Sequence, residues 1–211
     1  LQNRHLSVWA SHGRYYSNAE DAWKWQRPYL FSTTEDLLTQ TFVVPFLIPM
    51  LENSGAIVFS PRERSWQSEE IIVDNDAPTA NGSYLEKQQG SPWQQSPLPG
   101  FANTKTVYFD DDNPFSAGSA RMTAAASSKA KASYVKWMPK IRKSGMYEVY
   151  VSYQTLDGAV DDAEYTVYHG GVATRMKVNQ RMGGGTWVYL GRFFFSAGEN
   201  DKNSVVLSNV S

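Results

Sequence analysis

The sequence contains no cysteine and only three histidines among its 211 residues. Disulfide cross-links and cysteine-ligated zinc are therefore excluded, and any metal site would have to use histidine, aspartate or glutamate. No run of about eighteen apolar residues occurs, so we expect no membrane-spanning helix. Neither sign of charge predominates, with 20 Lys and Arg against 21 Asp and Glu. Because nucleic-acid binding depends on a basic surface, we expect no nucleic-acid partner.

Aromatic residues are abundant, with seven Trp and twelve Tyr. Such richness is common in β-proteins and carbohydrate binders, although aromatic residues also fill ordinary cores. The first residue is Leu1, and no signal-peptide pattern follows it. We therefore expect a trimmed or mature segment.

Residues 1 to about 70 have the pattern of an α/β segment. The stretch 5–10 (HLSVWA) predicts a short buried strand, and 56–60 (AIVFS) predicts a second one. Between them, after a long loop, residues 32–55 predict a helix. Strand, helix and strand in this order predict a parallel sheet with a right-handed crossover. Ligands gather at the carboxyl ends of the strands in such sheets.

The predicted helix carries start and stop signals. Ser32 followed by Glu35 fits a capping box, and Gly55 is placed to end the helix. Pro45 and Pro49 each remove a backbone hydrogen bond, so we expect a kink or break near them.

From about residue 71 to residue 211 the pattern becomes all-β. Residues 74–100 are rich in Gly, Pro, Ser, Asn and Gln, and they predict a long loop or a chain of turns. Short alternating runs follow, separated by turn residues and with no helical pattern between them. This arrangement predicts an antiparallel β-sandwich. The predicted strands are 133–137, 147–153, 163–169, 173–178, 186–195 and 204–208.

His12 and Glu35 are candidate metal ligands. His12 follows the first predicted strand and Glu35 lies in the first turn of the helix, so both can lie at the same end of the sheet. An imidazole and a carboxylate there could bind zinc in an open site. Each residue also has an ordinary explanation, because a loop histidine is usually polar surface and Glu35 completes the capping box. Arg14 and Tyr15, close to His12, are candidate substrate-binding residues.

The order SHG, TTEDLL and L-x-x-x-G-A-x-V-x-x-x-R-E-R resembles the opening of the zinc-dependent N-acetylmuramoyl-L-alanine amidases. The resemblance implies that His12 and Glu35 are the first two zinc ligands and that Arg62 steadies the substrate or its loop. It is confined to residues 1 to about 70, and it departs from the family in having WAS, not Asp-Pro-Gly, before the histidine. The family's second histidine and catalytic glutamate have no counterpart, so no catalytic residue is identified. We expect those groups beyond residue 211 and an inactive chain.

The second half is similar to the golvesin/xanthan lyase carbohydrate-binding-like domain. The resemblance covers most of residues 71–211 and includes the Asp-Asn-Asp of residues 74–76. The whole arrangement resembles Bacteroides-type secreted proteins labelled xanthan lyase, in which such a sandwich is inserted into an amidase-like domain. It implies a secreted, periplasmic or cell-surface location and a polysaccharide or peptidoglycan partner. Its main features are Tyr165-Thr166-Val167 with His169, Val178-Asn179-Gln180, Gly184-Gly185-Thr186-Trp187 and Leu190-Gly191.

Trp93, Trp137 and Trp187 are the candidate carbohydrate-binding residues, because the apolar face of a sugar ring stacks on an aromatic plane. The alternative for Trp137 and Trp187 is a place in the core, since both lie in predicted strands. Trp93 lies in the Gly/Pro/Gln-rich loop and is the better surface candidate.

Three functions follow from these patterns. The first is a fragment of a zinc-dependent amidase-like hydrolase that carries a glycan-binding sandwich. The second is a non-catalytic glycan-binding or scaffolding module. The third is a polysaccharide lyase, in which Tyr15 or Tyr16, beside His12 and Arg14, would abstract a proton next to a uronate carboxyl group.

Overall fold

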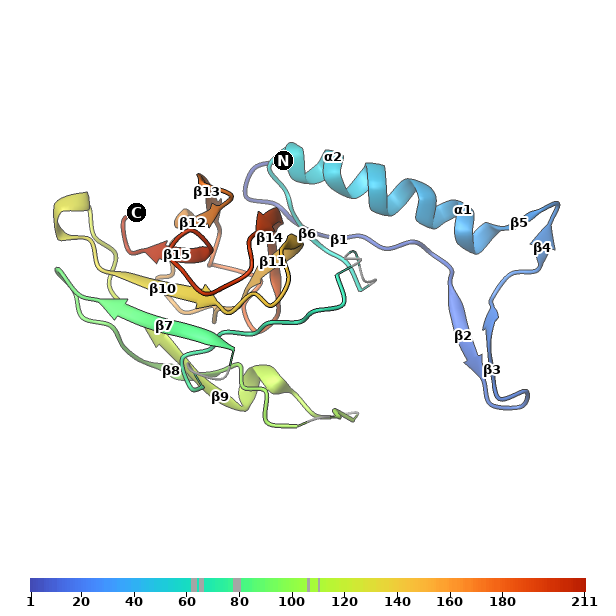
Figure 1. Cartoon of the computed structure of the whole chain (residues 1–211), viewed down its shortest axis with the longest axis horizontal. Coiled ribbons are helices and arrows are strands. Elements are labelled where there is room, and N and C mark those ends of the chain that lie inside the picture. Colours follow the sequence, from blue (N-terminus) through green and yellow to red (C-terminus); the bar gives the residue numbers. More distant parts are fainter. Residues whose placement is uncertain (62–63, 65–66, 78–80, 106, 110) are drawn as a thin grey trace. The chain divides into compact units, whose positions relative to one another are not determined.

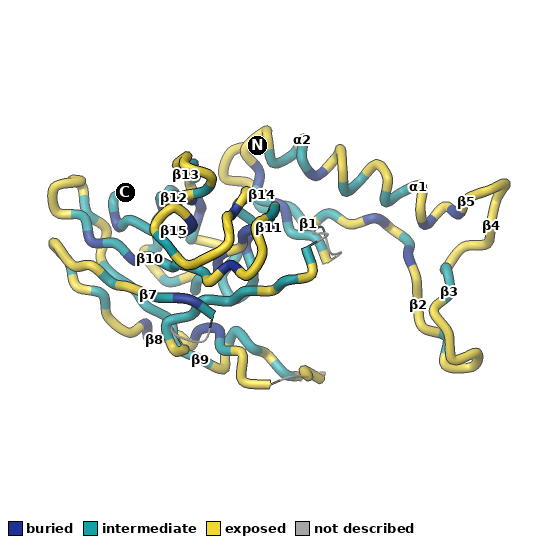
Figure 2. Tube along the Cα trace, viewed as in Figure 1, coloured by how far each residue is buried: buried dark blue, intermediate teal, exposed yellow. Residues whose placement is uncertain are grey.

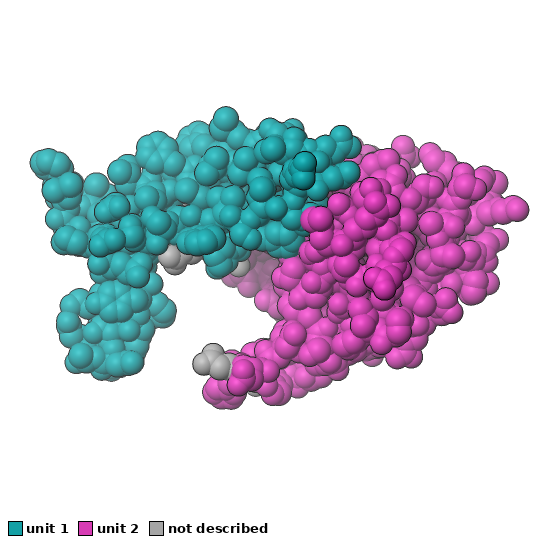
Figure 3. All heavy atoms as spheres, turned by 180° about the vertical axis from the view of Figure 1, so that it is seen from behind, with its two compact units in different colours: residues 1–64 teal, residues 65–211 magenta. Residues whose placement is uncertain are grey.

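The computed structural model describes residues 1–61, 64, 67–77, 81–105, 107–109 and 111–211. The chain divides into two compact units, residues 1–64 and residues 65–211 (Figure 3). No helix within the described ranges is both long enough and apolar enough to cross a membrane.

The first unit is built on a parallel pair of short strands, β1 (His5–Ser7) and β6 (Ile57–Phe59), connected through a helix (Figure 1). This confirms the predicted order of strand, helix and parallel strand. Leu6 and Val8 pack against the hydrophobic cluster that contains fully buried Ile48 of the helix. The remaining members of this small core are Val43, Leu51, Ala56 and Val58.

The helix runs as α1 (Glu35–Phe42), a π-helical turn (Val43–Leu47) and α2 (Ile48–Asn53). The π-helical turn contains Pro45, whose ring cannot fit an ordinary helical hydrogen-bond ladder. The expected interruption is therefore present. Gly55, with φ of +88°, follows the helix in the left-handed conformation that a side chain disfavours.

The predicted capping box is wrong in its cap residue. Thr34 caps the helix, because its hydroxyl accepts the Leu37 N–H at 3.3 Å, and the helix begins at Glu35. The outer side of the helix is also apolar, with Leu38, Phe42 and Met50 each at least half exposed (Figure 2).

The stretch predicted as a loop between the first strand and the helix contains two antiparallel pairs. One joins β2 (Arg14–Ser17) to β3 (Ala22–Trp25), and a second, shorter one joins β4 (Tyr29–Leu30) to β5 (Thr33–Thr34). The prediction missed these strands because RYYS and AWKW are too short to show a period.

The second unit consists of antiparallel sheets, consistent with a β-sandwich (Figure 1). Its largest sheet has the strand order β13-β12-β15-β10-β7, and two further pairs are β11 with β14 and β8 with β9. The strands are β7 (Gly82–Lys87), β8 (Gln94–Gly100), β9 (Gly118–Met122), β10 (Tyr134–Pro139), β11 (Gly145–Val151), β12 (Ala163–His169), β13 (Val172–Val178), β14 (Val188–Phe195) and β15 (Ser204–Ser208). Single 3-10 turns occupy Pro114–Ser116 and Lys129–Lys131.

The core of the second unit follows the alternation of its strands. Tyr165 and Val167 of β12 are buried, as are Val149 of β11 and Phe193 and Phe195 of β14. In β11 and β14 the adjacent residues Glu148, Tyr150, Arg192 and Phe194 are more exposed, as expected for a sheet with one buried face, whereas Thr166 of β12 is also buried.

The expectation that residues 74–100 form a loop is wrong in part, because β7 and β8 lie within it. β8 contains Pro97 and Pro99, which cannot donate to a neighbouring strand. Within the described part of the chain it pairs with β9 alone, and the register shifts between Gln95 and Pro99.

Candidate functional site

The first unit brings His12 and Glu35 into contact. His12 lies in the loop after β1, and Glu35 is the first residue of α1. The distance from His12 Nε2 to Glu35 Oε1 is 3.3 Å, with the imidazole side chain 20% exposed and the carboxylate 57% exposed. The two predicted residues are twenty-three positions apart in the sequence, but their side chains lie next to each other in the structure.

A third residue, Arg27, completes this group. Its guanidinium NH2 lies 3.4 Å from His12 Nε2, and its Nε lies 4.0 Å from Glu35 Oε2. A guanidinium can bind an anionic group, and an imidazole beside a carboxylate can accept a proton as a general base. The group lies at an open pocket of about 370 Å³ lined by His12, Tyr15, Gln26 and Arg27.

Backbone contacts hold this group in place. The Gly13 N–H donates to the side-chain oxygen of Gln26 at 3.0 Å, and the Gln26 N–H donates to the Gly13 carbonyl at 3.1 Å. The Arg27 N–H donates to Asp36 Oδ2 at 2.9 Å. These bonds connect the loop of His12 to the start of the helix, so they fix His12 beside Glu35.

The other predicted residues of this unit have different positions. Tyr15 lines the pocket. Arg14 lies opposite Trp25 across the β2–β3 pair, with its guanidinium 4.4 Å from the centre of the Trp25 ring. Arg62 lies outside the described residues. Arg64, from the same predicted loop, forms a bidentate ion pair with Glu52 at 2.7 and 2.8 Å.

The donor set fits zinc only in part. A catalytic zinc takes three protein ligands, and His12 with Glu35 supplies two. No group of three histidine, aspartate or glutamate side chains suited to a metal occurs among the residues that the structure describes. In addition, the Arg27 guanidinium contacts the same imidazole nitrogen that faces Glu35. The described residues therefore do not form a complete metal site.

In the second unit, the three predicted tryptophans are partly buried. Trp187 packs against Phe101, with ring centres 4.8 Å apart, and also contacts Phe115. Trp137 lies 5.9 Å from the Tyr84 ring. Trp93 precedes β8, and its indole N–H is buried without a partner in the described structure. Their predicted role in sugar binding stays a prediction, and none of the three is among the strongly exposed aromatic residues.

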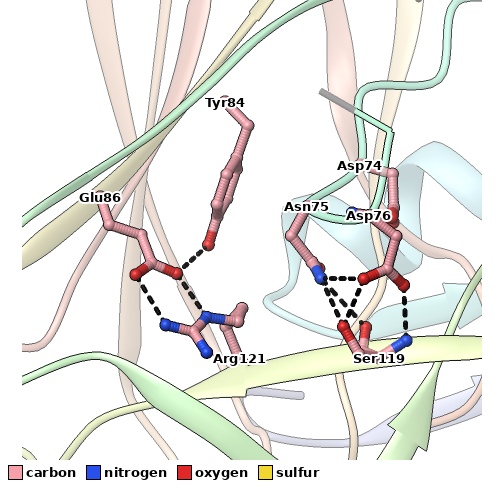
Figure 4. Close-up of polar contacts among 7 residues, drawn as sticks. All are labelled: Asp74, Asn75, Asp76, Tyr84, Glu86, Ser119 and Arg121. Carbon is pink, nitrogen blue, oxygen red and sulfur yellow. Dashed lines mark hydrogen bonds and ion pairs between the residues drawn. The ribbon is translucent and has the colours of Figure 1, made fainter. Parts of the chain in front are cut away.

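Two polar clusters connect β9 to other parts of this unit (Figure 4). In the first, Arg121 binds Glu86 at 2.6 and 2.9 Å, and the Tyr84 hydroxyl donates to Glu86 Oε1 at 2.6 Å. The hydrogen bond from Arg121 lowers the pKa of Glu86. Burial and the neighbouring Glu86 raise the pKa of Tyr84.

The second cluster explains the Asp-Asn-Asp of residues 74–76. Asp76 accepts the Ser119 N–H at 2.6 Å, and Asn75 donates to the Ser119 hydroxyl at 2.8 Å (Figure 4). Asp74 accepts the Asp76 N–H at 2.8 Å, and burial raises the pKa of Asp74. These bonds attach the segment to β9, so this motif has a structural role.

Comparison with known proteins finds similarity over part of the chain. Residues 111–211 match the family model described as the Golvesin C-terminal domain. No curated protein matches the chain. Among solved structures, a xanthan lyase of Paenibacillus is 21% identical with a TM-score of 0.44, and the match covers 63% of this chain. The chain spans only 11% of the length of that lyase.

Proposed function

We propose that this chain binds a polysaccharide through its β-sandwich and belongs to a secreted protein. The observation that carries the proposal is that outward-facing strand positions keep aromatic rings exposed. Tyr150 is 36% exposed, Tyr168 38% and Phe194 45%. The solvent face of an antiparallel sheet is normally polar, whereas exposed rings are suited to stacking on sugars. All three residues lie within the region that matches the Golvesin C-terminal domain.

Affinity electrophoresis tests this function. The chain is run in native gels that contain hydroxyethyl cellulose, galactomannan, xanthan or solubilised peptidoglycan, with serum albumin as the non-binding reference. We expect at least one polysaccharide to slow the chain relative to albumin. Unchanged mobility in every gel contradicts the proposal. New ultraviolet absorbance from unsaturated uronates during incubation with xanthan would instead favour a lyase.

A second candidate function rests on the contact between His12 and Glu35. We propose that this pair supplies two ligands of a zinc site in an amidase-like hydrolase acting on peptidoglycan, with further groups supplied from outside the described residues. The 3.3 Å approach of the imidazole to the carboxylate supports the proposal. We expect no hydrolysis of the muramoyl-L-alanine amide by this chain, because it offers two ligands and no identified base.

Zinc titration by calorimetry tests the second candidate without requiring activity. We expect weak binding by the chain and its loss in His12→Ala and Glu35→Ala. His169→Ala is the matched control, because His169 lies in the sandwich and contacts Thr174. Equal zinc affinity in all four proteins would exclude His12 and Glu35 as ligands.

A further inference from the structure

The outward face of the β11–β14 pair carries three cross-strand pairs of side chains. Met146 lies opposite Phe194, and Tyr150 lies opposite Tyr189. Between these pairs, Glu148 lies opposite Arg192. Because neighbouring residues on both strands are buried in the core, these six side chains share the opposite face. We name them the β11–β14 ladder.

A β-bulge in β14 makes this arrangement possible. Tyr189 and Arg192 are three positions apart, so a regular strand would place them on opposite faces. The register shifts between Val149 and Tyr150 of the partner strand, which brings both residues to one face. The bulge includes Gly191, where an added Cβ would lie 2.7 Å from the Phe193 ring. Bulges of this kind commonly direct side chains at functional sites.

The centre of the ladder is a buried carboxylate. The Glu148 side chain is only 9% exposed, whereas that of Arg192 is 54% exposed. The Tyr189 hydroxyl donates to Glu148 Oε2. Oε1 lies 3.7 Å from Arg192 Nε, beyond hydrogen-bond distance. Oε1 can therefore accept a hydrogen bond from a ligand, and the guanidinium can donate one.

Aromatic and apolar groups lie on both sides of these polar groups. The Tyr150 and Tyr189 rings are 5.3 Å apart and tilted by 55°. On the other side, Met146 is 41% exposed and Phe194 45% exposed. A few fixed polar groups among apolar ones is the usual composition of a small-molecule site. A pyranose ring offers the complementary surfaces, an apolar C–H face and an edge of hydroxyl groups.

We propose that the β11–β14 ladder is the polysaccharide-binding site and that it takes neutral sugars. The inference rests on the proposed function of the sandwich. Tyr150 stacks on a sugar ring, while Glu148 and Arg192 bind its hydroxyl groups. The neutral class follows from charge, because one carboxylate and one guanidinium cancel. A uronate carboxylate would gain from Arg192 but would be repelled by Glu148.

The test compares variants by affinity electrophoresis in hydroxyethyl cellulose, galactomannan and xanthan. For a neutral polysaccharide we expect Tyr150→Ala and Phe194→Ala each to weaken binding about tenfold or more. Tyr189→Phe keeps the ring but removes the hydroxyl that orients Glu148, and we expect a smaller loss. Val172→Ala is the control, because Val172 is an exposed apolar residue on β13 outside the ladder, and this variant should bind like the unaltered chain. Circular dichroism confirms that each variant is folded.

The outcomes separate this inference from the function on which it depends. Normal binding by folded Tyr150→Ala and Phe194→Ala overturns the site and leaves the function intact. Binding to xanthan with none to the neutral polysaccharides overturns the assigned ligand class. If the unaltered chain binds no polysaccharide, both the site and the function are overturned.

Discussion

Asp36 is the residue on which the geometry around His12 depends most. It is fully buried at the start of α1, and its Oδ2 accepts the Arg27 N–H. Its Oδ1 is also buried and has no hydrogen-bond partner within the described structure. A carboxylate in the first helical turn is favoured by the positive end of the helix dipole. Asp36 thus stabilises the helix start and the Arg27 segment together.

We expect Asp36→Ala to destabilise the start of α1 by about 1–3 kcal/mol, because the Arg27 N–H loses its acceptor and the helix loses a favourable charge. Hydrogen exchange of residues 35–42 measures the effect. Glu35→Gln is the control, because Glu35 is exposed and should change protection little. Unaltered protection in Asp36→Ala would show that this carboxylate does not hold the segment.

The sequence predicted His12 and Glu35 but not Arg27 or Asp36. A histidine after a strand and a glutamate in the first helical turn are recognisable patterns. Arg27 has no such pattern, because it lies in a stretch whose residues read as an ordinary polar loop. Asp36 was hidden because Glu35, its neighbour, already accounted for an acidic residue at the helix start. Its importance depends on the backbone of Arg27, nine positions away, which no local pattern reveals.

At the scale of elements, the strands that line the sandwich core were the ones predicted best. The prediction of strands at 163–169 and 204–208 is confirmed by β12 and β15. β7 and β8 were missed, because their sequences contain proline, glycine and charged residues that favour turns. The bulge that unites Tyr189 and Arg192 was also beyond prediction, because a bulge breaks the two-residue period on which strand prediction depends.

The helix between β1 and β6 was predicted as an element, but its details were not. Its apolar period was visible, and the effect of Pro45 on it was predictable from the missing N–H. The form of the interruption was not, since a π-helical turn and a kink both accommodate a proline. The cap is Thr34 and not the predicted Ser32, because β5 ends at Thr34, immediately before the helix.

At the scale of the whole molecule, the two units differ in how much core each possesses. The first has three buried residues, Ile48, Ala56 and Val58, in its hydrophobic cluster. The second buries side chains from both the five-stranded sheet and the β11–β14 pair. Within the sandwich, the Glu86–Arg121 ion pair connects β7 to β9.

The Glu86–Arg121 pair should make the stability of the sandwich depend on pH. Arg121 lowers the pKa of Glu86 below its ordinary value of 4.5. The unfolded chain then binds a proton at Glu86 more readily than the folded chain. The contribution of the pair is therefore fully present above pH 4.5 and is lost as the pH falls through the lowered pKa of the folded state.

We expect Glu86→Gln to lower the free energy of unfolding by about 1–2 kcal/mol at pH 7, because Arg121 keeps its charge without a carboxylate. At pH 3 the difference from the unaltered chain should shrink, because Glu86 is protonated in the unfolded chain below pH 4.5 while its pKa in the folded chain is lower. Urea denaturation followed by tryptophan fluorescence measures both values. Glu164→Gln is the control. Glu164 Oε1 lies 3.9 Å from Arg175 Nε, and the Arg175 side chain is mostly exposed, so this pair should contribute little to stability. A difference that is equally large at both pH values would mean that shape or packing at Glu86, not its charge, connects β7 to β9.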